Sequence, residues 1–115
     1  MHTVTLELGS PETALDAFRK AWTTGQGEET AHISFAAPEL LWKLLTAKRW
    51  DLLKAMTGQG PVTIRGAARL VGRDVKAVHG DTQALLAAGL LRRTEDGRIE
   101  FPFEAVHVDF MLRAA

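Results

Sequence analysis

Basic side chains recur at close spacing between residues 65 and 98, and their ammonium and guanidinium groups can bind phosphates. Arg65 and Arg69 lie four residues apart, which places both on one face of a helix. Arg73 and Lys76 follow at the start of a second amphipathic stretch. Such side chains also donate hydrogen bonds to base edges, so the pattern indicates chemistry suited to a nucleic acid.

The charge of the chain is unevenly distributed, although its 14 basic and 14 acidic residues sum to zero. Residues 46–98 hold ten bases and five acids (+5), whereas residues 1–45 sum to −3 and residues 99–115 to −2. A basic island between acidic flanks favours a polyanionic partner for one part of the molecule. Chance segregation in a small protein explains the charge pattern equally well, so this signal needs support from the elements.

Several other classes of site lack the residues they require. The chain has no cysteine, which excludes disulfides and thiolate metal sites, and its four histidines are not paired at helical spacing. We therefore expect neither a metal nor another cofactor. No glycine-rich phosphate loop or serine–histidine–acid set can be assembled, so an enzyme is not expected. No apolar run approaches a membrane span and no signal segment opens the chain, so we expect a cytoplasmic protein without a membrane partner.

Hydrophobic periodicity divides the chain into short strands and helices. Alternation of apolar and polar residues predicts strands over 2–8, 31–35 and 106–112, and a hairpin over 90–101 with a tight turn at Asp96-Gly97. Apolar stripes at helical spacing, with capping residues before them, predict helices over 11–22, 38–45, 46–56, 64–71 and 74–88. From residue 46 onward, this is the element order of a winged helix-turn-helix.

Residues 68–88 contain the positions on which the helix-turn-helix prediction depends. Ala68 is small where two helices must cross, Gly72 supplies the turn between them, and Asp74 is expected to cap the second helix. On a helical wheel the buried stripe comprises Val75, Val78, Thr82, Leu85 and Leu86. The opposite face collects Arg73, Lys76, Ala77, Gly80, Ala84 and Ala87.

That opposite face suits insertion into a DNA major groove. Its small residues allow the helix backbone to approach the DNA, and two basic residues lie near the start of the helix. A glycine tolerated on an exposed face explains Gly80 equally well. Arg65 and Arg69 are expected on backbone phosphates, and the arginines of the hairpin on the minor groove or adjacent phosphates. The predicted DNA-binding residues are Arg65, Arg69, Arg73, Lys76, Ala77, Gly80, Arg92, Arg93 and Arg98. Lys48 and Arg49 either reach phosphates or lie on a solvated surface, and His79 with Asp81 is rejected as a catalytic pair.

Three segments resemble a family of prokaryotic winged-helix DNA-binding proteins in the MarR-like superfamily, described as antitoxin-like transcriptional regulators. They are "LLTAKRWDLLKAM", "GRDVKAVHGDTQALLAAGLL" and "GRIEFPFEAVHVDF". The resemblance covers residues 33–112 and implies a dimeric repressor, often acting beside a toxin. Two positions depart from the family pattern: Gly80 replaces a larger polar residue and Gly66 replaces a glutamate.

These observations together predict an α+β fold in which a winged helix-turn-helix is flanked by strands that form a small sheet. The expected division is an N-terminal arm (1–45), a DNA-binding domain (46–101) and a C-terminal strand (102–115). The flanking strands can pair within one chain or across two, and exposed strand edges favour a homodimer. The predicted function is a repressor that binds specific double-stranded DNA, with a toxin as a further candidate partner. The alternative is a winged-helix interaction module that neutralises a partner protein without binding DNA.

Overall fold

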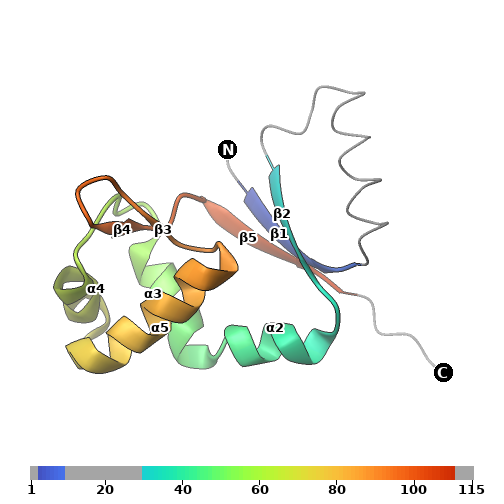
Figure 1. The fold of residues 1–115 in the computed structure, drawn as a ribbon, viewed down its shortest axis with the longest axis horizontal. Coiled ribbons are helices and arrows are strands. Elements are labelled where there is room, and N and C mark those ends of the chain that lie inside the picture. The colour runs from blue at the N-terminus through green and yellow to red at the C-terminus, as the bar shows by residue number, and fades with distance from the viewer. Residues whose placement is uncertain (1–2, 10–29, 111–115) are drawn as a thin grey trace. The chain divides into compact units, whose positions relative to one another are not determined.

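Two units make up the chain in the computed structural model, which describes residues 3–9 and 30–110. One unit comprises residues 1–41 and 103–115, and the other comprises residues 42–102. The two outer segments that the sequence separated as 1–45 and 102–115 therefore fall largely in one unit. Figure 1 shows the α+β architecture, with helices and strands in the order β1–β2–α2–α3–α4–α5–β3–β4–β5 among the described residues.

The first unit contains a small parallel sheet. Strand β1 (Thr3–Leu8) lies in the middle, and β2 (Thr30–Phe35) and β5 (Ala105–Asp109) both run parallel to it. The prediction that the flanking strands form a small sheet is confirmed, and they pair within one chain. The predicted helix over 11–22 and the last residues of the predicted strand 106–112 lie outside the described residues.

The register of this sheet separates an apolar face from a polar one. Residues paired in register point to the same face, so Val4 and Leu6 share a face with the apolar residues of both neighbouring strands. Val4 and Leu6 are fully buried. The opposite face carries Glu7, whose carboxylate lies 3.0 Å from Nδ1 of His32 on β2.

Helix α2 (Pro38–Leu44) follows β2 and starts at the proline, which has no N–H to leave unpaired in the first turn. It ends one residue before the predicted helix 38–45. Its Leu41 is fully buried. Within the described residues, no helix is both long enough and apolar enough to cross a membrane.

Helices α3 (Ala47–Met56), α4 (Ile64–Val71) and α5 (Val75–Ala88) form most of the second unit. Each begins after a side chain that accepts a hydrogen bond from a free backbone N–H: Thr46, Thr63 and Asp74, respectively. Helices α4 and α5 end at glycines in the left-handed region, Gly72 (φ 65°) and Gly89 (φ 86°). These starts and stops agree with the sequence prediction.

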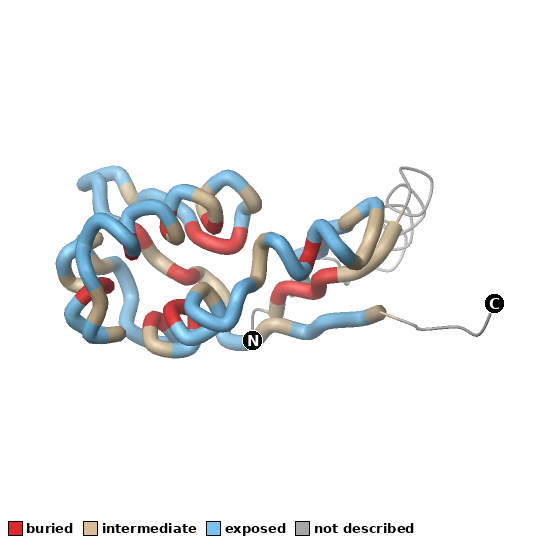
Figure 2. Tube along the Cα trace, turned by 90° about the horizontal axis from the view of Figure 1, so that it is seen from below, coloured by how far each residue is buried: buried red, intermediate tan, exposed pale blue. Residues whose placement is uncertain are grey.

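The core of the second unit contains residues of α3, α4 and α5 and of the segment 90–101 that follows them. Figure 2 colours the buried parts of the chain red. Ala68 is buried in α4, as expected for a close crossing. The buried apolar residues of the second unit are Leu52, Leu53, Met56, Ala67, Ala68, Val78, Leu85, Leu90, Leu91, Ile99 and Phe101. The buried stripe of α5 is Val78, Thr82 and Leu85. The prediction for Val75 is wrong: it is 42% exposed, because it opens the first turn of α5 and lines a surface groove instead.

Strands β3 (Arg92–Arg93) and β4 (Ile99–Glu100) form the predicted hairpin, and Val62 adds an antiparallel bridge to Ile99. The prediction of a tight turn with positive φ angles at Asp96-Gly97 is wrong in part, because Gly97 (φ 84°) has a positive φ and Asp96 does not. The N–H of Gly97 donates to the Thr94 carbonyl at 3.0 Å, and Thr94 N–H to the Arg98 carbonyl at 2.8 Å. A three-residue loop with one left-handed glycine therefore closes the hairpin.

Candidate nucleic-acid interface

An open groove lies where the start of α4, the start of α5 and the β3–β4 loop come together. We call it the α4–α5 groove, and it is lined by Thr63, Ile64, Arg65, Asp74, Val75, Lys76, His79 and Gly97. A second hollow beside it is lined by Arg65, Ala68, Arg69, Gly72, Arg73 and Val75. The structure thus gathers four of the predicted DNA-binding residues, Arg65, Arg69, Arg73 and Lys76, around one surface of the second unit.

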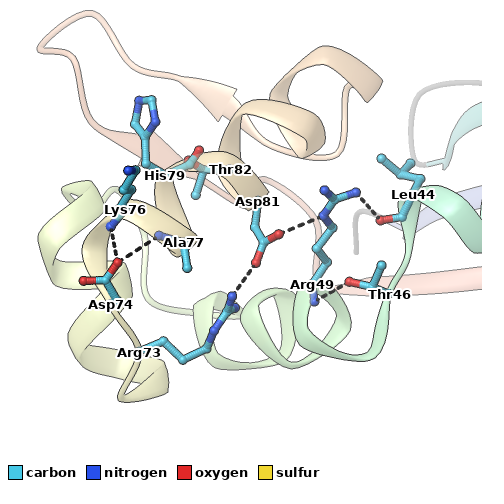
Figure 3. A network of polar contacts seen from close by, with 10 residues as sticks. All are labelled: Leu44, Thr46, Arg49, Arg73, Asp74, Lys76, Ala77, His79, Asp81 and Thr82. Atoms are coloured by element: carbon cyan, nitrogen blue, oxygen red, sulfur yellow. Dashed lines mark hydrogen bonds and ion pairs between the residues drawn. The ribbon is translucent and has the colours of Figure 1, made fainter.

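The first turn of α5 is held by Asp74. Its Oδ2 accepts the backbone N–H of Lys76 at 3.1 Å and that of Ala77 at 3.3 Å, which confirms Asp74 as the helix cap (Figure 3). The side chains of Lys76 and His79 point to the same side of α5 in Figure 3, away from Asp81. Sequence reasoning did not include His79 in the interface, although its i+3 spacing from Lys76 was available as a signal.

Three cations of this surface are exposed and have no acidic partner within ion-pair distance among the described residues. They are Arg65 and Arg69 on α4 and Lys76 on α5. Ammonium and guanidinium groups in this state can bind a phosphate or a base edge without first breaking a protein contact.

Ala77 and Gly80 are exposed on α5, as predicted. A Cβ built on Gly80 meets nothing within 4 Å, so packing within this chain does not require a glycine there. Gly66 differs, because a Cβ there lies 3.2 Å from Oγ1 of Thr63, the side chain that caps α4. The glycine at position 66 is therefore explained by the cap of α4, whereas no contact among the described residues explains a glycine at position 80.

Arg73 occupies a different place from the one expected on the wheel. Its Nη2 lies 2.8 Å from Oδ2 of Asp81, and its side chain is only 21% exposed. The wheel treated Arg73 as part of the helix, but α5 begins at Val75, so Arg73 precedes the cap and points back toward the body of the unit. Its guanidinium therefore forms an ion pair with Asp81 and does not point toward where a DNA base edge would lie.

Asp81 links α5 to α3 and to the turn that precedes α5. Its Oδ1 accepts a hydrogen bond from Nε of Arg49 on α3 at 3.0 Å, and Nη1 of Arg49 donates to the carbonyls of Lys43 (3.3 Å) and Leu44 (3.1 Å). Figure 3 shows Asp81 between the two arginines. Burial by itself raises the pKa of Asp81, but the hydrogen bond from Arg49 and the positive charges of Arg49 and Arg73 outweigh it and lower the pKa.

Sequence reasoning missed this cluster. The sequence predicts Arg49 either on phosphates or on a solvated surface, and it predicts no role for Asp81 beyond the rejected pair with His79. A signal was present, because Asp81 borders the buried stripe on the wheel, and a carboxylate there needs cationic partners. Nothing in the local pattern identified which arginines would supply them.

The arginines of the hairpin all have local partners. Nε of Arg92 lies 2.5 Å from Oε1 of Glu100, Nε of Arg98 lies 3.2 Å from Oδ2 of Asp96, and Arg93 donates to the Gly97 carbonyl at 3.3 Å. A hydrogen bond from Thr94 Oγ1 holds the pKa of Asp96 below its usual range. Ion pairs of solvent-exposed arginines are weak in water, so a phosphate can compete with either carboxylate.

No group of three or more histidine and acidic side chains within the described ranges is arranged to hold a metal ion. The α4–α5 groove and the hollow beside it instead bring basic side chains together near the start of α5.

A family model described as HVO_A0114 matches residues 44–108, from the last residue of α2 into β5, and so includes the whole candidate interface. No curated protein and no solved structure matches the chain. The family description names no activity.

Proposed function

The chain belongs to the HVO_A0114 family, whose model covers more than half of its residues, and we propose that it is a sequence-specific DNA-binding regulator. In this proposal α4, the Gly72 turn and α5 form a helix-turn-helix, and the β3–β4 hairpin forms a wing. The bridge between Val62 and Ile99, which ties the segment before α4 to the hairpin, supports a winged-helix arrangement.

The observation that carries the proposal is the exposed side of the first turns of α5. Lys76, Ala77 and Gly80 combine one unpaired cation with two small residues, and Arg65 lines the same groove from α4. A major groove about 12 Å wide admits an α-helix whose N-terminal residues contact base edges.

The roles of the remaining basic residues follow from placing α5 in the major groove. Arg65 and Arg69 contact phosphates beside the groove. Arg93 of β3 and Arg98 of the β3–β4 loop contact the adjacent backbone or minor groove, and Arg92 is a further phosphate contact. Arg73 is not a base reader in this proposal. It positions α5 through Asp81, which is 15% exposed and held by two arginines.

The wider biological role in the proposal is that of a cytoplasmic homodimeric repressor. Regulators of this kind bind two half-sites with a two-fold dimer, and the resemblance to antitoxin-like regulators supports such an arrangement. The acidic outer segments, −3 over residues 1–45 and −2 over residues 99–115, suit a basic partner protein such as a toxin.

A second candidate function is an interaction module that binds a partner protein and no DNA. The observation in its favour is the 60% exposure of Trp42, at the end of α2, because large aromatic side chains are enriched in protein interfaces. DNA binding by the intact protein separates the two proposals.

The test is a fluorescence-anisotropy titration of the full chain with a duplex from upstream of its own gene and with a scrambled duplex. We expect the logarithm of the affinity to fall linearly with the logarithm of the salt concentration. Lys76→Ala should cost about 1–3 kcal/mol on the upstream duplex and less on the scrambled one. Arg65→Ala should weaken both duplexes equally and reduce the salt slope by about 1.

Lys54→Ala is the matched control, because Lys54 is an exposed cation on α3 that lines neither hollow. It should leave both affinities close to those of the wild type. A folded protein that binds neither duplex at low salt contradicts the proposal and favours the interaction module. Equal losses in Lys76→Ala and Lys54→Ala contradict the assigned surface.

A further inference from the structure

Strand β5 (Ala105–Asp109) is an edge of the parallel sheet. It pairs with β1 on one side, and no strand among the described residues pairs with its other side. An edge strand presents unpaired N–H and C=O groups, and proteins usually protect it with proline, lysine or a covering segment. Strand β5 contains neither proline nor lysine, and four of its five residues are exposed.

We propose that β5 pairs antiparallel with β5 of a second copy of this chain, so that one sheet runs through both protomers. The inference deepens the homodimer contained in the proposed function and rests on it for its biological meaning. Its physical basis, however, is the composition of the strand, and its test requires no DNA.

The residues of β5 are self-complementary in one register. Antiparallel pairing centred on Val108 places Val108 opposite the partner's Val108, and His107 opposite the partner's Asp109. The two-fold axis repeats the imidazole–carboxylate pair, so it forms twice. An imidazole N–H donates to a carboxylate whether the ring is neutral or protonated, and directly opposite residues are the pairs that stabilise antiparallel strands.

The existing sheet gives Asp109 a reason to gain such a partner. In the β1–β5 register Asp109 lies beside Glu7, so two carboxylates are neighbours on the polar face. Glu7 already has His32 at 3.0 Å, on the side of β2. Like charges in adjacent positions are destabilising, and a donor from the partner's His107 would relieve Asp109.

Alternative pairings satisfy fewer side chains. Centring the two strands on His107 instead places the two imidazoles opposite each other and Asp109 opposite the partner's Ala105. The other edge, β2 (Thr30–Phe35), contains no acidic residue, so no register of β2 with itself forms an imidazole–carboxylate pair. Pairing β5 with β2 of a second chain is head-to-tail and continues into longer assemblies rather than closing as a dimer.

The experiment is sedimentation equilibrium of the full chain in four forms: wild type, His107→Asp, Asp109→His and the double variant. The wild type should sediment at twice the mass of one chain. Each single substitution places like groups opposite each other at two positions and should weaken the dimer at least about tenfold. The double variant exchanges the two groups, restores both pairs and should return to within about threefold of the wild type.

Circular dichroism and thermal unfolding of each variant separate a lost interface from a lost fold. A wild type that stays monomeric at about 100 μM overturns the inference. Failure of the double variant to recover overturns the register, and a mass that grows beyond two chains indicates head-to-tail pairing and overturns it too. Absence of DNA binding in a protein that shows the expected dimer contradicts the proposed function alone.

Discussion

At the scale of single residues, Asp81 connects α5 to the rest of the second unit. One carboxylate is shared between Arg73, in the turn before α5, and Arg49 on α3 (Figure 3). Arg49 in turn holds two carbonyls at the end of α2. The orientation of α5 therefore depends on a charged cluster as well as on the apolar core beneath it.

Replacing Asp81→Asn should destabilise the protein by about 1–3 kcal/mol, because two partly buried guanidiniums lose their counter-charge. Urea unfolding at pH 7 measures the loss. Asp51→Asn is the matched control: Asp51 is 67% exposed and lies 3.8 Å from Lys54, so the change should stay within about 0.5 kcal/mol. Equal effects of the two substitutions would show that the Asp81 cluster is not coupled to folding.

The same carboxylate should make stability depend on acid pH. Its pKa in the folded protein lies below the ordinary value of 3.8, so the unfolded chain binds more protons in this range and stability rises with pH. The contribution is fully present above the unfolded-state pKa and is lost as the pH falls through the folded-state pKa. Unfolding free energies measured from neutral pH down to about pH 2.5 should fall less steeply in Asp81→Asn than in the wild type. Parallel curves for the two proteins would contradict the assignment.

At the scale of the elements, local signals decide where the helices of the second unit begin and end. Thr46, Thr63 and Asp74 accept hydrogen bonds from backbone N–H groups that have no partner within the helix. Gly72 and Gly89 adopt the left-handed conformation that stops the chain from continuing helical. Capping and stopping involve only neighbouring residues, so the sequence predicted these boundaries correctly.

Two glycines near α5 should respond in opposite ways to the same substitution. Gly80→Ala should stabilise the protein by about 0.5–1 kcal/mol, because the position is helical and the added methyl group has open space. Gly72→Ala should destabilise it by about 1–2 kcal/mol, because φ is 65° there. Thermal unfolding measures both changes.

If Gly80 serves close approach to DNA, the stabilised Gly80→Ala protein should bind the upstream duplex more weakly than the wild type. Unchanged binding would leave Gly80 as a tolerated glycine. The stability comparison with Gly72→Ala stands in either case, because it depends only on backbone conformation.

At the scale of the whole molecule, two units with different compositions meet different demands. Residues 46–98 carry a charge of +5 and contain the proposed DNA-binding surface, whereas the outer segments are acidic and supply the parallel sheet. The three strands of the sheet carry Glu7 and Asp109 and no lysine or arginine, so the sheet is a poor surface for DNA and a suitable one for contact with protein. This division agrees with the proposed separation of a reading surface from a dimer interface.

A two-fold dimer makes a prediction about the spacing of its DNA sites. Once the bound region is footprinted, inserting about 5 base pairs between the half-sites should weaken binding strongly, because the second half-site turns to the opposite side of the duplex. Inserting about 10 base pairs should restore part of the affinity. The measurement is the anisotropy titration with the three duplexes. Equal affinities for all of them would indicate that single chains bind independently.

The sequence by itself determined the α+β class, the strands, the helix boundaries after residue 38 and the segregation of charge. These features depend on short-range periodicity, capping and glycine conformation, which neighbouring residues specify. It also predicted that Lys76, Ala77 and Gly80 would be exposed, because their places on α5 follow from the helical repeat.

Only the tertiary structure decided which strands pair, and which charged groups face one another. Arg73 turned from an expected base reader into a partner of Asp81 because it precedes the first residue of α5, where the helical repeat no longer sets side-chain direction. Arg49 reaches the same carboxylate from 32 positions away along the chain. Contacts between residues so far apart in sequence depend on how elements pack, and no local pattern encodes that packing.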